Sequence, residues 1–329
     1  MMLIFGKSEL TFTTLFDILT IDKFGYEVNV MSNVLAQGIY PALVSHFKND
    51  GTVLKDSIRA NMERNFAQGA GGFYICGSTG EGPVITSAMR KEIAETVVDV
   101  NNGRGLIINH IGAAAPIDAF ELARHAKSCG CDAISSVVPN FYFKYNDDEI
   151  VDYYKRLAVE SELPVIAYAQ SLLTSDPVNL MKRLIEIEGV IGVKFTLTDF
   201  YSMRRIKELN GGDINVINGP DEMLICGLSM GADAGIGSTY NLMCGEYVKL
   251  RNLFLAGDIE GARATQYKVN KVTEILIKYG VIRSIKYVLS LDGIEAGDIA
   301  YPGSPLTDAE KKGLVEELTN VGFFTDYNK

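Results

Sequence analysis

A lysine and a tyrosine each close an apolar segment of the sequence, at positions where they could do chemistry. Lys194 follows the run 190–193, and Tyr168 follows the run 164–167. If both runs are strands that end at one mouth, the lysine amine is withdrawn from water, and burial favours its neutral form. A neutral amine attacks a ketone to form a Schiff base, and a neighbouring phenol can move the protons that imine formation and carbon–carbon cleavage require. The pair therefore predicts imine chemistry.

Further polar residues follow other apolar runs. The loop 77–82 (GSTGEG) offers two hydroxyls and backbone N–H groups, which suit a carboxylate. Segment 218–222 (NGPDE) carries an acidic pair, and 235–240 (GIGSTY) carries three more hydroxyls. The glycine spacing at the first loop imitates a phosphate-binding loop, but Ser78 stands where that motif needs lysine, and no dinucleotide-binding glycine pattern follows a strand. Both nucleotide interpretations therefore fail.

Eight short apolar segments must position these residues. Each is apolar at most positions instead of alternating, as strands buried on both faces of a parallel sheet are. They span Gly38–Val44, Gly72–Cys76, Gly105–His110, Asp132–Val138, Pro164–Tyr168, Val190–Lys194, Ile214–Ile217 and Ala232–Ile236. The segments between them have helical periodicity: Ser87–Val100 with Ser87 as its N-cap, Pro116–Ser128, Asp147–Ser161, Pro177–Glu188 and Ser202–Leu209. This rhythm predicts an α/β fold, a (β/α)8 TIM barrel whose polar strand ends meet at one mouth.

The sequence divides into three parts on this interpretation. Residues 31–242 form the barrel, and 243–329 form C-terminal helices packed on it. Those helices are predicted at Tyr247–Ala256, Ile259–Tyr279, Val281–Leu291 and from about Thr307. Residues 1–30 are an N-terminal extension whose acidic residues and missing basic start do not fit a signal peptide. The sequence leaves open whether this extension is natural or precedes a start at Met31.

Composition excludes several function classes. The 329 residues carry a net charge of −10, which repels nucleic acid and anionic membrane surfaces, and no basic patch opposes it. No apolar run reaches the roughly 18 residues that span a bilayer. The five cysteines are scattered and the three histidines have no paired-ligand spacing, so we expect no metal, no cofactor and a reducing, cytoplasmic location.

The motifs together resemble the N-acetylneuraminate lyase and dihydrodipicolinate synthase family of pyruvate-dependent class I aldolases, over about residues 37–320. The likeness rests on GSTGE at 77–81, GVKFT at 192–196 and GADAGIGSTYN at 231–241. NGPDE, IGSTYN, Thr196 followed by DFYSM, and IKYGVIRSIKYVL at 277–289 resemble the neuraminate lyase branch.

The resemblance implies a cofactor-free lyase that reversibly cleaves N-acetylneuraminate to N-acetylmannosamine and pyruvate. Lys194 would form the imine, Tyr168 would relay protons, and Ser78 with Thr79 would bind the carboxylate. The residues implied to bind the sugar hydroxyls are Thr196, Gly219, Asp221, Glu222 and Ser238. The family further implies a homotetramer in which an aromatic side chain, Phe141 or Tyr142, helps complete a neighbouring subunit's site.

Two alternatives remain at this stage. One is another pyruvate aldolase of the superfamily, acting on a 2-keto-3-deoxy sugar acid or making dihydrodipicolinate; the other is a non-catalytic barrel that binds sugar acids. The acidic pair of NGPDE suits a neutral polyol better than a dicarboxylate. The chain departs from the family pattern after Tyr168, where Ala169-Gln170-Ser171 replaces Asn or His, an apolar residue and proline.

Overall fold

The computed structural model describes residues 19–21, 27–29, 33–139, 143–169 and 176–327. Contacts within the chain divide it into two units, Met1–Asn33 and Val34–Lys329. The described part of the first unit is an antiparallel strand pair, β1 (Leu19–Ile21) and β2 (Glu27–Asn29). The predicted neighbour-facing aromatic, Phe141 or Tyr142, and the departure at 170–171 lie outside the described residues.

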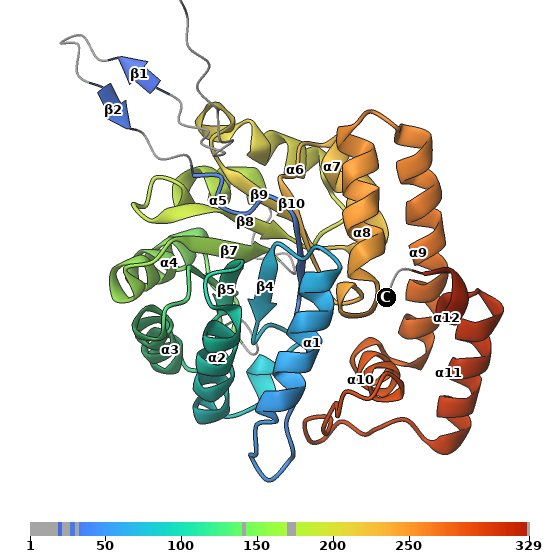
Figure 1. Ribbon diagram of the computed structural model, residues 1–329. Helices are drawn as coiled ribbons and strands as arrows, with labels where there is room; N and C mark the ends of the chain where they lie inside the picture. The colour runs from blue at the N-terminus through green and yellow to red at the C-terminus, as the bar shows by residue number, and fades with distance from the viewer. Residues whose placement is uncertain (1–18, 22–26, 30–32, 140–142, 170–175, 328–329) are drawn as a thin grey trace, which may run out of the picture. The chain divides into compact units, whose positions relative to one another are not determined.

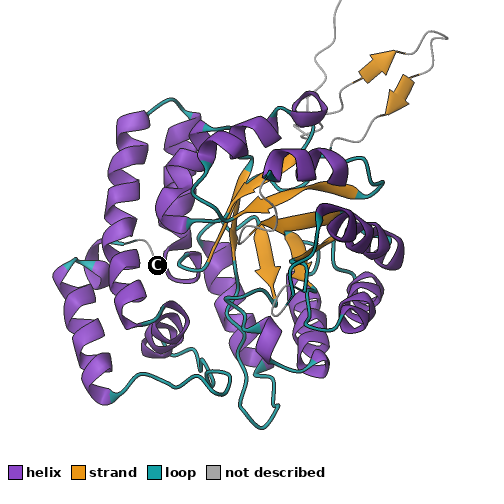
Figure 2. Ribbon diagram, turned by 180° about the vertical axis from the view of Figure 1, so that it is seen from behind, coloured by secondary structure: helices purple, strands orange, loops and turns teal. Residues whose placement is uncertain are grey.

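The second unit is built on eight parallel strands, in the order β3-β10-β9-β8-β7-β6-β5-β4. They are β3 (Ile39–Pro41), β4 (Gly72–Ile75), β5 (Leu106–His110), β6 (Ala133–Ser136), β7 (Val165–Ala169), β8 (Val190–Phe195), β9 (Asn215–Asn218) and β10 (Ala234–Gly237). The ring closes between β3 and β4, where the Leu43 N–H donates to the Tyr74 carbonyl at 2.9 Å. Helices surround these strands (Figure 2). The predicted (β/α)8 barrel is therefore confirmed.

The helices of the barrel and its C-terminal part complete the unit (Figure 1). They are α1 (Lys55–Ala67), α2 (Ser87–Asn101), α3 (Pro116–Cys129), α4 (Asp147–Ser161), α5 (Pro177–Leu184), α6 (Phe200–Lys207), α7 (Leu224–Ser229), α8 (Tyr240–Leu255), α9 (Ile259–Tyr279), α10 (Val281–Leu291), α11 (Asp308–Asn320) and α12 (Phe323–Asp326), with 3₁₀ turns η1 (Gly82–Val84), η2 (Leu209–Gly212) and η3 (Asp221–Met223).

The sequence prediction differs from the structure at several helices. Helix α1 was not predicted, because the face that it buries includes Ser57, Asn61 and Asn65 beside Ile58 and Met62, so hydrophobic periodicity is weak. The short α7 was missed as well. Helix α5 is shorter than expected, and α8 begins at Tyr240 instead of Tyr247 because an initial buried turn joins it across a kink.

The N-terminal cap of α2 also needs correction. Ser87 was predicted to cap this helix, but it is the first helical residue. The cap is Thr86, whose extended backbone lets its side chain accept a hydrogen bond from the Met89 N–H. The difference moves the cap by one residue and leaves the helix itself in place.

Three apolar clusters hold the second unit together. One fills the barrel and includes Tyr40, Tyr74, Ile108, Ile166, Ile217 and Ile236. A larger cluster lies between the strands and the surrounding helices α1 to α6. The third joins α8, α9, α10 and α11 on one side of the barrel (Figure 1). Polar residues lie beside the first cluster, at the carboxyl ends of the strands. They are the candidates for an active site.

The described ranges lack two kinds of feature. Within them, no helix combines the length and apolar character needed to cross a bilayer. In the same part of the chain, no three His, Cys, Asp or Glu side chains come together in a way that could hold a metal ion.

Candidate active site

The position of Lys194 depends on an irregularity in strand β8. Val193 and Phe195 pack in the cluster against the helices, whereas Ile191 faces the barrel interior. Strict alternation from Ile191 would therefore place Val193 inside and Lys194 outside. The pairing of β7 with β8 shifts register between Val165 and Ile166, so one extra residue is taken up in β8. Lys194 is thereby turned into the interior.

Gly192 occupies this irregularity because no side chain fits there. A Cβ at this position would lie 2.0 Å from the carbonyl oxygen of Asn215 on β9. The close approach of the two backbones is thus compatible only with glycine, and it accompanies the register shift that sets the direction of Lys194.

Lys194 and Tyr168 lie side by side in neighbouring strands. They are register partners of β8 and β7, and both are buried, with 6% and 3% of their surface exposed. The Lys194 Nζ lies 3.9 Å from the centroid of the Tyr168 ring and 4.8 Å from that of Tyr74. The two rings meet edge to face at a centroid distance of 6.2 Å. The amine therefore sits in an aromatic enclosure within reach of a phenol.

The surroundings of Tyr168 favour loss of its proton. Burial raises the pKa of the phenol, but the charge of Lys194 and the polar groups of Lys194, Thr196 and Ser78 near the phenol oxygen outweigh it, so the net pKa is lowered. The Tyr154 hydroxyl fixes the backbone at this point, because it accepts from the Tyr168 N–H at 3.3 Å. A phenol with a lowered pKa beside an amine is suited to passing a proton to and fro.

The loop between β4 and η1 supplies hydroxyls to the same mouth. Ser78 is exposed, whereas Thr79 is buried and its Oγ1 lies 2.7 Å from the Oγ of Ser238, which follows β10. This bond joins the loop after the second barrel strand to the loop after the eighth. Small hydroxyl side chains in this arrangement can donate to a substrate carboxylate.

The two acidic residues after β9 differ in burial. Asp221 is buried and accepts from the Thr239 N–H and hydroxyl at 2.7 and 2.8 Å. Its burial raises its pKa to about 6, against the opposing effect of the Thr239 bonds. Glu222 is exposed, and its carbonyl accepts from the Asn270 amide on α9 at 3.0 Å. The two carboxylates are therefore adjacent in sequence but differ in environment.

Gly219 is required by the side chain next to it. A Cβ at this position would lie 2.0 Å from the Thr196 Oγ1 and 3.0 Å from the Phe195 carbonyl. Gly219 and Thr196, both predicted site residues, are therefore neighbours in the structure, and the missing side chain of Gly219 leaves the space that the Thr196 hydroxyl occupies.

Three residues of this region were not predicted to belong to the site. Tyr74 faces Lys194 from β4, and its hydroxyl donates to Ser135 at 3.2 Å. Thr239 holds Asp221, and His110 packs edge-on against the Tyr168 ring with centroids 5.8 Å apart. Tyr74 lies three residues before Gly77, the first residue of the glycine loop, so its place near the end of β4 was the available signal.

Two buried histidines give the protein a predicted acid sensitivity. Burial, then a nearby cation, lowers the pKa of His46 to about 4 and that of His110 to about 3. Both values lie below the roughly 6.5 of an unfolded histidine, so between these limits only the unfolded chain gains the protons. Stability is therefore lost as pH falls below about 6.5, by about 2 kcal/mol per histidine at pH 5. The raised pKa of Asp221 offsets part of this loss.

Urea unfolding at pH 7 and pH 5 measures this effect. We expect His46→Gln to lose less stability than the unmodified chain between the two pH values, and Asp221→Asn to lose more. An equal loss of stability between pH 7 and pH 5 in all three proteins would contradict the shifted pKa values of His46 and Asp221.

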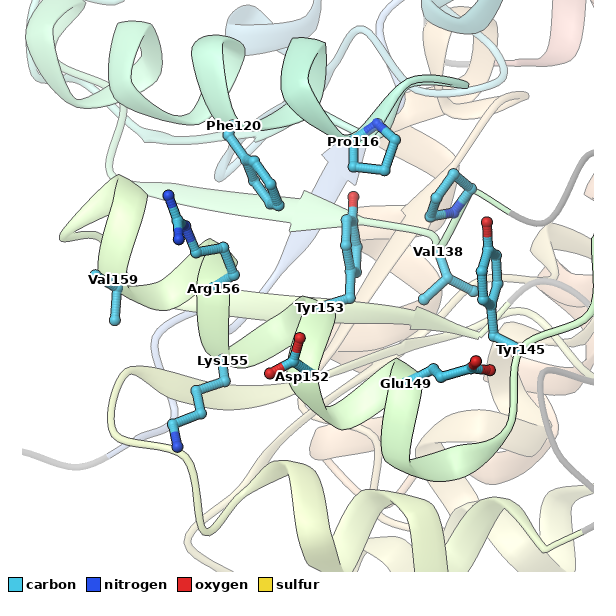
Figure 3. A pocket seen from close by; sticks show the side chains of 11 residues that line it. Pro116, Phe120, Val138, Tyr145, Glu149, Asp152, Tyr153, Lys155, Arg156 and Val159 are labelled. Atoms are coloured by element: carbon cyan, nitrogen blue, oxygen red, sulfur yellow. The ribbon is translucent and has the colours of Figure 1, made fainter.

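A cavity of about 670 Å³ lies apart from these residues, between α3 and α4 (Figure 3). Phe120 and Tyr153 point toward each other across it, with ring centroids 6.0 Å apart. Glu149, Asp152 and Arg156 lie along its α4 side. Its lining includes none of the predicted site residues, so this cavity is separate from the candidate active site.

The fold and the strand-end residues define the class of protein. A (β/α)8 barrel that brings a buried lysine, a tyrosine, hydroxyls and carboxylates to the carboxyl ends of its strands has the organisation of a TIM-barrel enzyme. The chain belongs to the dihydrodipicolinate synthetase family, whose sequence profile matches residues 35–321. The resemblance noted in the sequence is thus confirmed.

Comparison with individual proteins narrows the relationship. The chain is 34% identical to the N-acetylneuraminate lyase of Rhizobium meliloti, over 87% of this chain and 95% of the relative. It is 35% identical to that of Citrobacter koseri, over 86% and 97%. Among solved structures, the N-acetylneuraminate lyase of Proteus mirabilis superposes with a TM-score of 0.83 at 29% identity, covering 88% of this chain and 99% of that one.

A further solved relative bears on the chemistry of the site. The sialic acid aldolase of Ruminococcus gnavus, in a form described as a catalytic lysine mutant, superposes with a TM-score of 0.80 at 27% identity. The match covers 87% of this chain and 96% of the relative. These relationships support a carbon–carbon lyase and favour the neuraminate lyase branch over the alternatives.

Proposed function

We propose that this protein is a Schiff-base lyase that reversibly cleaves N-acetylneuraminate to N-acetylmannosamine and pyruvate. The observation that carries the proposal is the buried pair of Lys194 and Tyr168, with the amine 3.9 Å from the phenol ring centroid. The substrate is taken from the relatives, which are named N-acetylneuraminate lyase.

The chemistry begins at the Lys194 amine. Its nitrogen attacks the keto carbon of the open-chain sugar acid, and the carbonyl oxygen leaves as water after it gains protons, which gives a protonated imine. Tyr168 supplies and recovers these protons. The C4 hydroxyl then passes its proton to the Tyr168 oxygen as the C3–C4 bond breaks and its electron pair moves toward the protonated imine, which releases N-acetylmannosamine and leaves an enamine. Protonation at C3 and hydrolysis of the resulting imine release pyruvate and restore the amine.

The remaining residues are assigned by position. We infer that Ser78 and Thr79 bind the carboxylate of pyruvate or the sugar acid, since their hydroxyls lie on the loop after β4. The sugar hydroxyls are assigned to the residues after β8, β9 and β10: Thr196, Gly219, Asp221, Glu222 and Ser238. Carboxylates and hydroxyls are suitable partners for a neutral polyol.

Borohydride reduction in the presence of pyruvate, followed by peptide mapping, tests the mechanism. We expect the adduct on Lys194, and its absence there would overturn the imine mechanism. Assays of N-acetylneuraminate cleavage and of pyruvate condensation with aspartate semialdehyde then separate the substrates. An adduct without neuraminate cleavage would retain the chemistry and shift the function to another pyruvate aldolase, whereas sugar-acid binding with neither adduct nor turnover would indicate a non-catalytic barrel.

Asp221 predicts a pH dependence of substrate binding. Its burial-raised pKa of about 6 means that the carboxylate is charged above this pH and neutral below it. The charged form is the better acceptor for a sugar hydroxyl, so KM for N-acetylneuraminate should rise by about tenfold between pH 7 and pH 5. Steady-state kinetics should show a higher KM for Asp221→Asn that changes little over this range. A flat KM in the unmodified chain would contradict the role of Asp221.

We also infer a cytoplasmic homotetramer, on the resemblance to the family. Light scattering should then give about four times the chain mass of 36.0 kDa, and cell fractionation tests the location. A monomeric mass would overturn the assembly and leave the chemistry of Lys194 to be judged separately.

A further inference from the structure

Glu81 belongs to the GSTGE motif but is directed away from the mouth. It is 5% exposed, and its carboxylate accepts from the Lys286 Nζ of α10 at 2.6 Å and from the Ala300 N–H at 2.7 Å. Its backbone has φ of 55°, in the left-handed region that a residue other than glycine rarely adopts. The loop therefore accepts an unfavourable backbone conformation while its glutamate is held by the C-terminal part of the chain.

Lys286, the partner of Glu81, is also buried and makes several contacts. It is 3% exposed, donates to Glu81 and to the Asp298 carbonyl, and lies 4.2 Å from the centroid of the Phe47 ring. Burial of two charges is costly unless each finds its partners. Here the partners come from segments far apart in the sequence, so the pair connects the loop after β4 to α10 and the segment that follows it.

The rest of the loop leaves little freedom for adjustment. The Gly80 carbonyl accepts from the Ser45 hydroxyl at 2.6 Å, and a Cβ at Gly82 would lie 1.8 Å from the Cys76 carbonyl. Thr79 is joined to Ser238 across the mouth at 2.7 Å. A shift of Glu81 must therefore move the neighbouring Ser78–Gly80 backbone with it.

We propose that the Glu81–Lys286 ion pair is a positioning device that holds the Ser78–Thr79 loop where it can bind the carboxylate of a 2-oxo acid substrate. The C-terminal helices thereby contribute to substrate binding through α10, without contact between Lys286 and the substrate. This inference rests on the proposed function, because it concerns the carboxylate that Lys194 is proposed to capture.

The test is the dependence of the Lys194 adduct on pyruvate concentration, with borohydride as the trapping agent. We expect Glu81→Gln to raise the half-saturating pyruvate concentration by about tenfold, because a hydrogen bond between charged groups becomes a weaker one. The trapping rate at saturating pyruvate should change by much less. The double variant Glu81→Gln/Lys286→Met, which removes both buried charges together, should show at least as large an increase.

A second, partly buried ion pair supplies the control. Lys207 and Asp233 lie 2.8 Å apart, each 15% exposed, and contact neither the loop nor α10 through any of their hydrogen bonds. Lys207→Met/Asp233→Asn should lower the thermal midpoint and leave the pyruvate dependence unchanged. A purely structural role for Glu81 and Lys286 predicts the same behaviour for both pairs.

A cycle of variants separates positioning from loss of stability. Ser78→Ala should weaken pyruvate capture strongly in the unmodified chain and only slightly in the Glu81→Gln background, since the hydroxyl is already displaced there. Unchanged pyruvate dependence in every Glu81 or Lys286 variant that folds would overturn the inference. Lack of any adduct in the unmodified chain would instead overturn the proposed function, so the two failures are distinguishable.

Discussion

Lys194→Met should abolish turnover of N-acetylneuraminate, with kcat lower by about 10⁴-fold or more. Methionine keeps most of the volume between the Tyr74 and Tyr168 rings, so the barrel should still fold, but no nitrogen remains to attack the keto carbon. Cleavage would then have to proceed without an imine that accepts the electrons of the breaking bond. Continuous measurement of pyruvate release reports the loss of turnover, and borohydride trapping reports the loss of the pyruvate adduct.

Two further variants define the specificity of this result. Lys194→Arg keeps a positive charge beside the rings but offers no neutral amine, so it should be as inactive as Lys194→Met. Lys271→Met removes an exposed lysine of α9 and should behave as the unmodified chain. Substantial turnover by Lys194→Arg would mean that charge, not imine formation, is what Lys194 supplies.

Tyr168→Phe should lower kcat by about 10²- to 10⁴-fold, the usual contribution of a general acid–base group. The ring that packs beside Lys194 is retained, so KM should change little and the pyruvate adduct should still form, more slowly. The pKa of Tyr168 is lower than that of a free tyrosine, which is about 10. In the unmodified chain, kcat should therefore fall at a pH below about 10, where the phenol loses the proton that it supplies. That alkaline limb should be absent from the variant.

Tyr74→Phe is the matched control for this prediction. Tyr74 also faces the Lys194 amine, but its hydroxyl is engaged with Ser135 in the barrel interior. Loss of that hydroxyl should lower kcat by less than about tenfold, since it removes a structural hydrogen bond and no proton relay. Equal losses in the two variants would contradict a special role for the Tyr168 hydroxyl.

The barrel could be predicted from the sequence because its strands are unusually uniform. All eight apolar runs became strands, with ends displaced by a few residues, since strands that are covered on both faces must be apolar nearly throughout. The helices were predicted less evenly. Helix α1 buries three polar side chains in its inward face, so its periodicity was hidden.

The site could be predicted in part for the same reason. Polar residues that directly follow apolar strands must gather at one end of a parallel barrel, and Lys194, Tyr168, Thr79 and Ser238 do so. Tyr74 was missed because an aromatic residue inside an apolar run has the appearance of core. Lys286 was included only as part of a helix that resembles the family, because nothing local to α10 indicates a partner more than two hundred residues away.

The sequence by itself determined the residue types at the strand ends, and hence the chemistry that they can perform. Tertiary structure alone decided their directions. An apolar run without alternation carries no signal for inside or outside. The register shift between β7 and β8 beside Gly192, where β9 also approaches closely, is what turns Lys194 into the barrel. In the same way, Glu81 turns away from Ser78 and Thr79 because a buried lysine of α10 holds it. Both outcomes depend on contacts between distant segments, which exist only once the barrel has closed.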